Sequence, residues 1–412
     1  MGILGKICNI LNYCNITDIC QFCRLINFDD FLYKISTLSE FNYKFNLFFL
    51  KKHQCNQNCN KKIIERHQFL IVNFRKKSLS LWIIKFNMRK VIYFLILLFP
   101  IVSCIQQKNN RSEVKSMSVP TFNADSAYQF TKKQVDFGAR VPNTIAHDRC
   151  AVYLVKELKG FGAEVFEQKI NLTAFDGTIL KSVNIIGSFN PKAQTRILLF
   201  SHWDSRPWAD HDQNPENRTK PVLAANDGAS GVGVLLEMAR LMQKNAPAVG
   251  VDILFCDSED YGKPESAGDQ NSEDSWCLGT QYWAKTPHIP GYTARFGILL
   301  DMVGAPNATF FKEQASEYFA GGIVEKVWSQ AKNLGFGQYF RDEKGGAITD
   351  DHIYVNRIIG IPSIDIIHFD PNSGSGFGTY WHTTHDTMDN VDKNTLNAVG
   401  TTLMHVVYME AL

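Results

Sequence analysis

The chain has 412 residues, of which 43 are basic and 41 acidic, and its formal net charge is +2. This nearly neutral balance lacks the basic surface of a nucleic-acid-binding protein, so we expect no nucleic-acid partner. A hydrophobic fraction of 45% is ordinary for a globular protein with a substantial core. The length fits one large α/β domain or two smaller ones.

Residues 88–104, MRKVIYFLILLFPIVSC, have the layout of a secretory signal: two basic residues, an apolar stretch and small residues at the end. The apolar stretch is too short for a comfortable membrane span. Its end, IVSC, resembles a bacterial lipobox, in which Cys104 becomes a lipidated N-terminus; a plain anchor helix is the alternative. We therefore expect an exported, membrane-anchored lipoprotein of the cell envelope, facing the periplasm or the cell surface.

Residues 1–87 precede this signal, where no folded domain is expected. We interpret them as a mis-assigned or disordered extension, with Met88 as the true start. A zinc ribbon is the alternative, because CQFC and CNQNC are paired cysteine spacings, although that motif is loose. Residues 105–119 follow the signal as a polar tether. We expect one folded domain over residues 120–412 and a monomer.

Strands and helices alternate along this domain. Helical spacing predicts helices over residues 126–138, 144–162, 228–245, 274–285, 321–335 and 394–412. Alternating or continuous apolar runs predict strands over residues 163–172, 182–189, 195–202, 251–256, 294–304 and 361–369. The alternation predicts an α/β fold: a three-layer sandwich whose central sheet is mixed, mostly parallel and flanked by helices. In such sheets the functional site lies beyond the carboxyl ends of the strands.

Carboxylates and imidazoles gather at those strand ends and at the starts of two helices. They are His202, Asp204, Asp227, Glu259, Asp260, Asp301, His382, His385 and Asp386. Desolvating a carboxylate is costly unless a partner or a metal compensates it. Imidazole and carboxylate together suit Zn²⁺, which takes nitrogen and oxygen ligands tetrahedrally. The pattern predicts a zinc site, provided that these strand ends converge.

Each of these residues also has a simpler interpretation. Asp227 precedes the helix that starts near Gly228, so it could act as that helix's cap. His385 and Asp386 could form no more than a solvated turn. Glu259 and Asp260 are adjacent at the end of a buried strand, where successive side chains point in different directions. These two acids can therefore serve different partners.

Six sequence blocks resemble, in order and spacing, the zinc-dependent glutaminyl-peptide cyclotransferases of the animal type and their bacterial relatives. The blocks are SHWDSRPWAD, AANDGASGVGVLLEMAR, DSEDYG, LLDMVGAPNATF, DDHIYVNRIIGIPSIDII and WHTTHDTMDN. The resemblance covers residues 120–412. This family belongs to the same superfamily as the di-zinc aminopeptidases. LLDMVGAPNATF and the TDDH stretch favour the cyclase branch over the aminopeptidases.

The resemblance implies one catalytic zinc and a reaction that converts an N-terminal glutamine of peptides to pyroglutamate with release of ammonia. It also implies residue roles. Asp227, Asp260 and His382 correspond to the zinc ligands, and Glu259 corresponds to the general acid/base. Asp301 and Asp350 correspond to acids near the substrate amide, and Trp381 to an aromatic wall of the pocket. Like charges around Glu259 would raise its pKa.

Two other functions stay open. A zinc aminopeptidase would use the full two-metal ligand set, in which His202 and Asp301 add to Asp227, Asp260 and His382, with Glu259 as base. A metal-free binding domain would need lost ligands, and none is lost.

Two departures from the animal enzymes bear on the pocket. Asp260 stands where those enzymes have Glu, and the segment KPESAGDQNSED lacks their pocket tryptophan. Trp208, Trp276 or Phe377 could substitute for it, with ordinary packing as the alternative for each.

Overall fold

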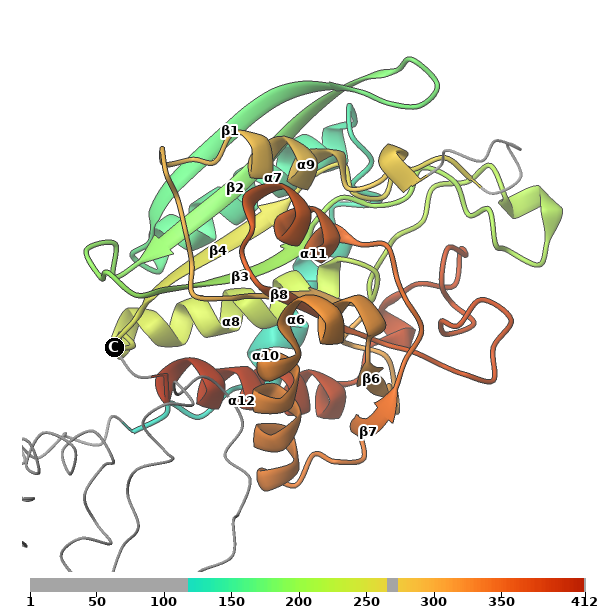
Figure 1. Ribbon diagram of the computed structural model, residues 1–412. Helices are drawn as coiled ribbons and strands as arrows, with labels where there is room; N and C mark the ends of the chain where they lie inside the picture. Colours follow the sequence, from blue (N-terminus) through green and yellow to red (C-terminus); the bar gives the residue numbers. More distant parts are fainter. Residues whose placement is uncertain (1–117, 265–272, 411–412) are drawn as a thin grey trace, which may run out of the picture. The chain divides into compact units, whose positions relative to one another are not determined.

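The computed structural model describes residues 118–264 and 273–410 (Figure 1). The expected extension (1–87), the signal (88–104) and all but the last two residues of the tether lie outside these ranges. Among the residues that are described, no helix combines the length and the apolar character needed to cross a membrane.

Eight strands form within the described ranges. They are β1 (Glu164–Thr173), β2 (Ile179–Phe189), β3 (Arg196–His202), β4 (Gly250–Cys256), β5 (Gly297–Asp301), β6 (Phe310–Lys312), β7 (Phe340–Lys344) and β8 (Ser363–Ile367). Six of them make the central sheet in the order β1-β2-β4-β3-β5-β8, and β6 and β7 pair separately. β4, β3, β5 and β8 run parallel, whereas β1 and β2 are antiparallel to their neighbours. The carboxyl ends of the four parallel strands therefore meet at one edge.

Helices cover both faces of this sheet. They are α6 (Ala124–Val135), α7 (Ile145–Gly160), α8 (Ala229–Lys244), α9 (Leu278–Lys285), α10 (Gln314–Asn333), α11 (Asp351–Tyr354) and α12 (Lys393–Tyr408), with a π-helical turn, η5 (Val355–Ile359), after α11. Figure 1 shows α8, α10 and α12 on one side of the sheet and α9 and α11 on the other. The three-layer α/β sandwich predicted from the sequence is confirmed.

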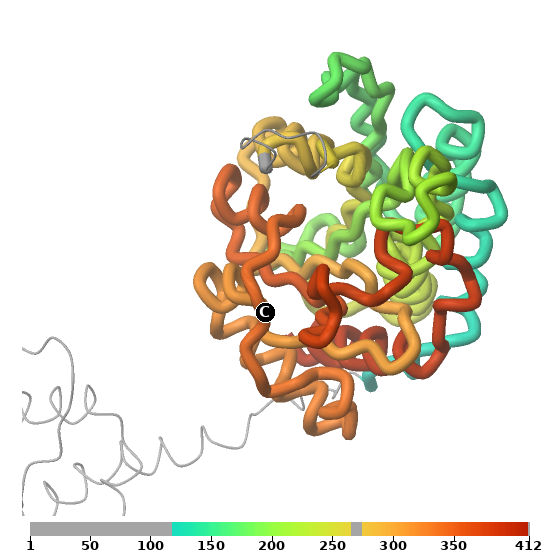
Figure 2. Tube along the Cα trace, turned by 90° about the vertical axis from the view of Figure 1, so that its right-hand side faces the viewer, coloured from blue at the N-terminus to red at the C-terminus, as the bar shows by residue number. Residues whose placement is uncertain are grey.

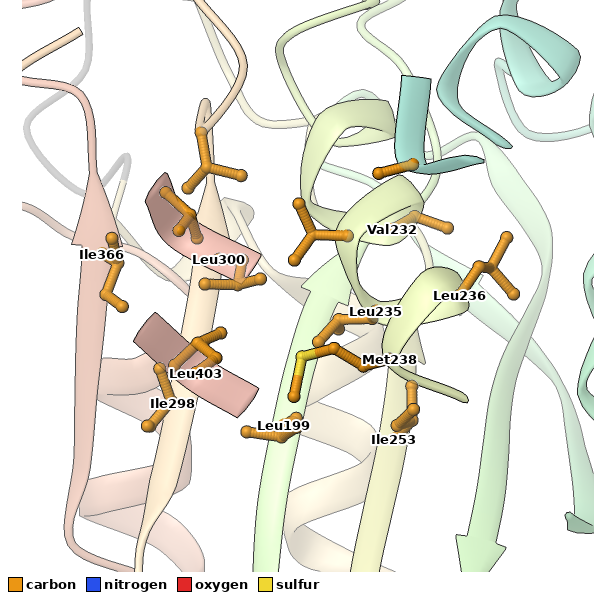
Figure 3. Packing of buried hydrophobic residues seen from close by; sticks show 14 of the residues in the cluster. Leu199, Val232, Leu235, Leu236, Met238, Ile253, Ile298, Leu300, Ile366 and Leu403 are labelled. Atoms are coloured by element: carbon orange, nitrogen blue, oxygen red, sulfur yellow. The ribbon is translucent and has the colours of Figure 1, made fainter. Parts of the chain in front are cut away.

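The alternation of side chains along β3 explains these layers. Leu199 points to a core shared with α8, α10 and α12, whereas Leu198 and Phe200 point to a second core shared with α9. Figure 3 shows the first core, in which Leu235 and Met238 of α8 lie over the sheet. Both faces of β3 are fully buried, which is why its sequence is a continuous apolar run rather than an alternating one.

Element boundaries differ from the prediction in two informative places. α10 begins at Gln314, not at 321, because Glu313 caps it by accepting hydrogen bonds from the amides of Ala315 and Ser316. Ala320 is non-helical inside it, just before two glycines, and this kink hid the first turns from the helical pattern. α11 was also missed; at four residues it is too short to show a helical period.

Candidate active site

The polar residues predicted at the strand ends do converge. His202 ends β3, Asp301 ends β5 and Glu259 follows β4, and all three are buried. Figure 2 faces this edge of the sheet and shows the loops gathered around it, including the segment that leads into α12. The described loops on this edge bring together residues that are far apart in the sequence.

Two overlapping groups of potential metal ligands form there. Asp227, Asp260 and His382 each offer a ligand atom, and these atoms lie within 4.8 Å of one another. His202, Asp227 and Asp301 form a second group within the same limit. Asp227 belongs to both groups. The first group is the predicted zinc ligand set, and the second contains the two additional residues of a di-zinc site.

The residues of the first group fit a metal ion. The Oδ2 atom of Asp260 is buried and accepts no hydrogen bond, so this oxygen is available to bind a cation. Nε2 of His382 lies 3.3 Å from Asp260 Oδ1 and 3.7 Å from Asp227 Oδ2, so nitrogen and oxygen donors face one another. One imidazole and two carboxylates supply the nitrogen and oxygen donors that zinc takes, and a catalytic zinc with three protein ligands keeps a position open.

The interpretation of Asp227 as a helix cap is wrong. The N-cap of α8 is Gly228, with a φ of 87°, and no side chain caps this helix. The glycine is required by space as well, since a Cβ there would lie 2.7 Å from Cε1 of His202. The tight turn at Gly228 leaves Asp227 facing His202 and His382.

His202 is held by carboxylates on several sides. Its Nε2 lies 3.0 Å from Asp227 Oδ1 and 3.2 Å from Asp301 Oδ1, and its Nδ1 lies 3.6 Å from Asp204. Burial disfavours the imidazolium, but hydrogen bonds with Asp204, Asp227 and Asp301 raise the pKa of His202 well above its ordinary value. The second group is therefore internally paired by hydrogen bonds to this imidazole.

Glu259 is buried beside the first group and contacts a thiol. Sγ of Cys277 donates to Glu259 Oε1 at 3.3 Å, and the amide of Cys277 donates to the Glu259 carbonyl at 3.0 Å. Burial raises the pKa of Glu259 well above its usual range, and the charges of Asp260 and Asp350 act in the same direction. The predicted upward direction is found, but burial is its largest cause, rather than neighbouring acids alone.

Asp350 also lies close to Glu259. Asp350 caps α11 by accepting from the amide of Asp351, and its carboxylate is within 4.8 Å of ligand atoms of Glu259 and Cys277. Burial raises the pKa of Asp350 well above its ordinary value, with the charge of Asp301 as the next cause. Two acids with a tendency to stay protonated thus line the same site.

Two buried carboxylates hold the loops that carry these groups. Asp386 accepts from the amides of Asn226 and Asp227, at 2.8 and 3.0 Å. Asp204 accepts from the amides of Glu259 and Asp260, at 3.1 and 3.2 Å. The interpretation of a solvated turn is therefore wrong for Asp386, which is fully buried.

His385, next to Asp386, is exposed, as expected for a residue in a solvated turn. The bracing roles of Asp204 and Asp386 were not predicted, because an acid that accepts from distant backbone amides leaves no local pattern.

Aromatic rings line both sides of His382. Trp381 stacks on it with ring centroids 3.8 Å apart, and Phe377 packs on Trp381 at 4.8 Å. Trp276 lies parallel to His382, with centroids 5.9 Å apart and an angle of 10° between the planes. Of the three candidates for the missing tryptophan, Trp276 is the one whose ring stacks on a residue of the first group.

Strained backbone concentrates around the site. Among the described residues, eight that are not glycine have a positive φ, and four of them are Ser258, Cys277, Met302 and His382. These either belong to the site or adjoin Glu259 and Asp301. Such conformations cost about 1–3 kcal/mol each and persist where the surroundings enforce them. The fold thus gives up some free energy of folding to orient these side chains.

Comparison with known proteins gives a family and a set of solved relatives. The model of peptidase family M28 matches residues 184–407. The glutaminyl-peptide cyclotransferase of Bos taurus is 29% identical over 56% of this chain, and the match spans 66% of the bovine protein, just under two thirds of its length.

Two solved structures are more similar. The glutaminyl cyclase of Bacteroides thetaiotaomicron, bound to N-acetylhistamine, is 55% identical with a TM-score of 0.70, covering 71% of this chain and 100% of that one. A Zn-dependent exopeptidase from Parabacteroides distasonis is 58% identical, with the same TM-score and coverage. The family model and the fold agree over the β-strands that carry the site, and the chain belongs to peptidase family M28.

Proposed function

We propose that the protein is a glutaminyl-peptide cyclotransferase, which closes the N-terminal glutamine of peptides to pyroglutamate and releases ammonia. The similarity to cyclases from Bos taurus and Bacteroides thetaiotaomicron supports this activity. The observation that carries it at the site is the pairing of Glu259 with a neighbouring three-ligand group, Asp227, Asp260 and His382. In the reaction the α-amine attacks the side-chain amide carbon, a C–N bond forms, and the bond to the amide nitrogen breaks.

Asp227, Asp260 and His382 would hold one zinc ion. When bound, zinc supplies Lewis-acid polarisation of the side-chain carbonyl and stabilises the negative charge that develops on its oxygen. The attack is intramolecular, so the protein's own task is to hold one productive rotamer of the glutamine. Trp381, stacked on His382, and Trp276 on the other side would bury its methylenes and exclude water, which is the competing nucleophile.

Glu259 would move the protons. It takes one proton from the α-ammonium and gives it to the departing nitrogen, which leaves as ammonia, and then takes the second proton that the ring nitrogen must lose and releases it to solvent. A raised pKa suits both steps, because the group must accept and then release a proton near neutral pH. Asp301 and Asp350 would hydrogen-bond the substrate amide; burial favours their protonated forms, which can donate to an oxygen.

The alternative is a zinc aminopeptidase with one or two zinc ions, which would use Glu259 to activate a water. The second ligand group and the similarity to the Parabacteroides exopeptidase support this alternative. The ligand residues are common to both functions, and the LLDMVGAPNATF and TDDH blocks favour the cyclase.

A product assay separates the two functions. The purified protein, supplied with zinc, is incubated with a Gln-initiated peptide and with the same peptide initiated by Leu. We expect ammonia and an N-terminally blocked peptide from the first and no reaction with the second. Free glutamine, or free leucine, would contradict the cyclase and support the aminopeptidase.

We also propose that the protein is exported and anchored to the membrane through a lipid on Cys104, on the strength of the signal layout of residues 88–104. Metabolic labelling with a palmitate analogue tests this, with Cys104→Ser as the control. A wild-type protein without label would contradict the anchor, and label retained in Cys104→Ser would do the same.

A further inference from the structure

The hairpin between β1 and β2 extends well past the sheet, on the side where the site lies. β2 begins at Ile179 but first pairs with β4 at Ile185, which faces Phe255, and β4 ends one residue later at Cys256. At about 3.3 Å a residue, the hairpin projects roughly 15 Å beyond the end of β4. Figure 1 shows it at the upper right, on the same side as the loop that follows β3.

The projecting hairpin is anchored to the loops of the site. Asn143 donates to the carbonyl of Ile179 and accepts from the amide of Lys181, which holds the end of the hairpin next to its turn. The hydroxyl of Ser182 lies 2.5 Å from that of Ser258, the residue directly before Glu259. These contacts hold the hairpin in a fixed position beside the site.

The turn of the hairpin and the residue that follows it carry apolar side chains that do not pack into the core. Phe175 is 39% exposed and Ile179 is 51% exposed. The ring of Phe175 packs edge-on against Trp208, with centroids 6.0 Å apart, and Trp208 packs in the same way against Tyr261, at 5.2 Å. Tyr261 directly follows Asp260 in the chain, so this contact returns to the first ligand group.

A buried arginine connects the same rings to His382. The guanidinium carbon of Arg206 lies 5.4 Å from the ring centre of Trp208 and 4.6 Å from that of Trp276. Trp276 in turn stacks on His382. Phe175, Trp208, Tyr261 and Trp276, which we call the aromatic row, therefore lead from the metal group to the exposed tip of the hairpin.

We propose that the aromatic row binds the peptide chain that follows the N-terminal residue of the substrate, and that it favours apolar side chains there. The inference rests on the proposed function, in which the N-terminal residue occupies the space at His382. The rest of the peptide must then leave past neighbouring side chains, and the rings of the row, with Arg206 between Trp208 and Trp276, extend from that space to the hairpin turn. Exposed apolar groups beside a site commonly mark binding surfaces.

Substrate length provides the test. The variant Phe175→Ala is compared with the wild type on a Gln-initiated dipeptide and on two Gln-initiated pentapeptides, which carry either apolar or polar residues at positions three to five. We expect the wild type to prefer the apolar pentapeptide. Phe175→Ala should lower kcat/KM for this peptide about three- to tenfold, the effect of uncovering part of one aromatic contact. The dipeptide should react as before.

Two further variants control the experiment. Trp208→Phe keeps a ring next to Phe175 and should retain most of the preference. Val152→Ala removes an exposed apolar side chain from the middle of α7 and should change nothing. Equal losses on the dipeptide and the pentapeptides, or a wild type indifferent to positions three to five, would overturn the inference. If free glutamine appears instead of ammonia, the proposed function fails, and the same length comparison is then made on the released glutamine.

Discussion

The two ligand groups share Asp227 yet differ in how their polar atoms are satisfied. In the second group, Nε2 of His202 lies within hydrogen-bonding distance of both Asp227 and Asp301. In the first group, Oδ2 of Asp260 is buried without a hydrogen bond. A buried, unpaired carboxylate oxygen is costly, and a cation removes that cost. The unpaired oxygen of Asp260 therefore supports a bound cation in the first group.

The largest expected effect comes from breaking the first group. Asp260→Ala removes a carboxylate ligand that belongs to this group alone. We expect zinc to be lost and kcat/KM to fall by about 10³-fold or more, since the developing negative charge loses its main stabilisation. Zinc per chain is measured alongside ammonia release. A variant that keeps one zinc per chain would show that the ion lies elsewhere.

Glu259→Gln separates proton transfer from metal binding. Glutamine keeps the size of the side chain but cannot carry the proton, so we expect a loss of ~10²–10⁴-fold in kcat. Zinc content should stay at the wild-type value, in contrast to Asp260→Ala. If both variants lose zinc equally, the division of roles between these adjacent acids is wrong.

Asp386→Ala acts on the residue that both groups share. It removes the acceptor for the amides of Asn226 and Asp227, and each unsatisfied buried donor costs about 1–3 kcal/mol. We expect a lower free energy of unfolding and zinc affinity weakened about 10–100-fold, as for other residues that orient ligands. Chemical denaturation and zinc titration with a competing chelator provide the measurements.

Asp204→Ala is the matched control for Asp386→Ala, because it releases Glu259 and Asp260 but not Asp227. It should weaken zinc binding and also lower kcat at saturating zinc, whereas Asp386→Ala should recover most of its kcat there. Identical behaviour of the two variants would contradict separate bracing of the two loops.

The smallest effect is expected in the second group. His202→Asn keeps a hydrogen-bond donor near Asp227 and Asp301 while removing the imidazole. If His202 is a hydrogen-bonding partner, zinc stays at one per chain and kcat/KM falls by only about tenfold, the worth of one weakened charged hydrogen bond. A fall in zinc from two ions to one would instead identify His202 as a ligand.

The sequence predicted the fold and the positions of the site residues because both depend on local patterns. Buried strands such as β3 are continuous apolar runs, and the polar residues that interrupt them at His202 and Asp301 mark the strand ends. The family resemblance then distinguished Glu259 from Asp260, which composition and periodicity treat alike.

What escaped the sequence depends on contacts between distant segments. The bracing by Asp386 joins residues 160 positions apart, and the thiol contact of Cys277 with Glu259 depends on a left-handed backbone at that cysteine. Trp276 carried a partial signal, an aromatic residue at the end of a polar segment, but its stacking on His382 required the fold. Long-range geometry of this kind has no period and no fixed spacing in the chain.

The central claim is that one zinc ion, held by Asp227, Asp260 and His382, serves the cyclisation. Anomalous diffraction at the zinc edge tests it most directly, on crystals of protein that cyclises Gln-initiated peptides and has been equilibrated with excess zinc. The account predicts one strong peak, among these three side chains. A second peak of similar height between His202 and Asp301 would contradict it.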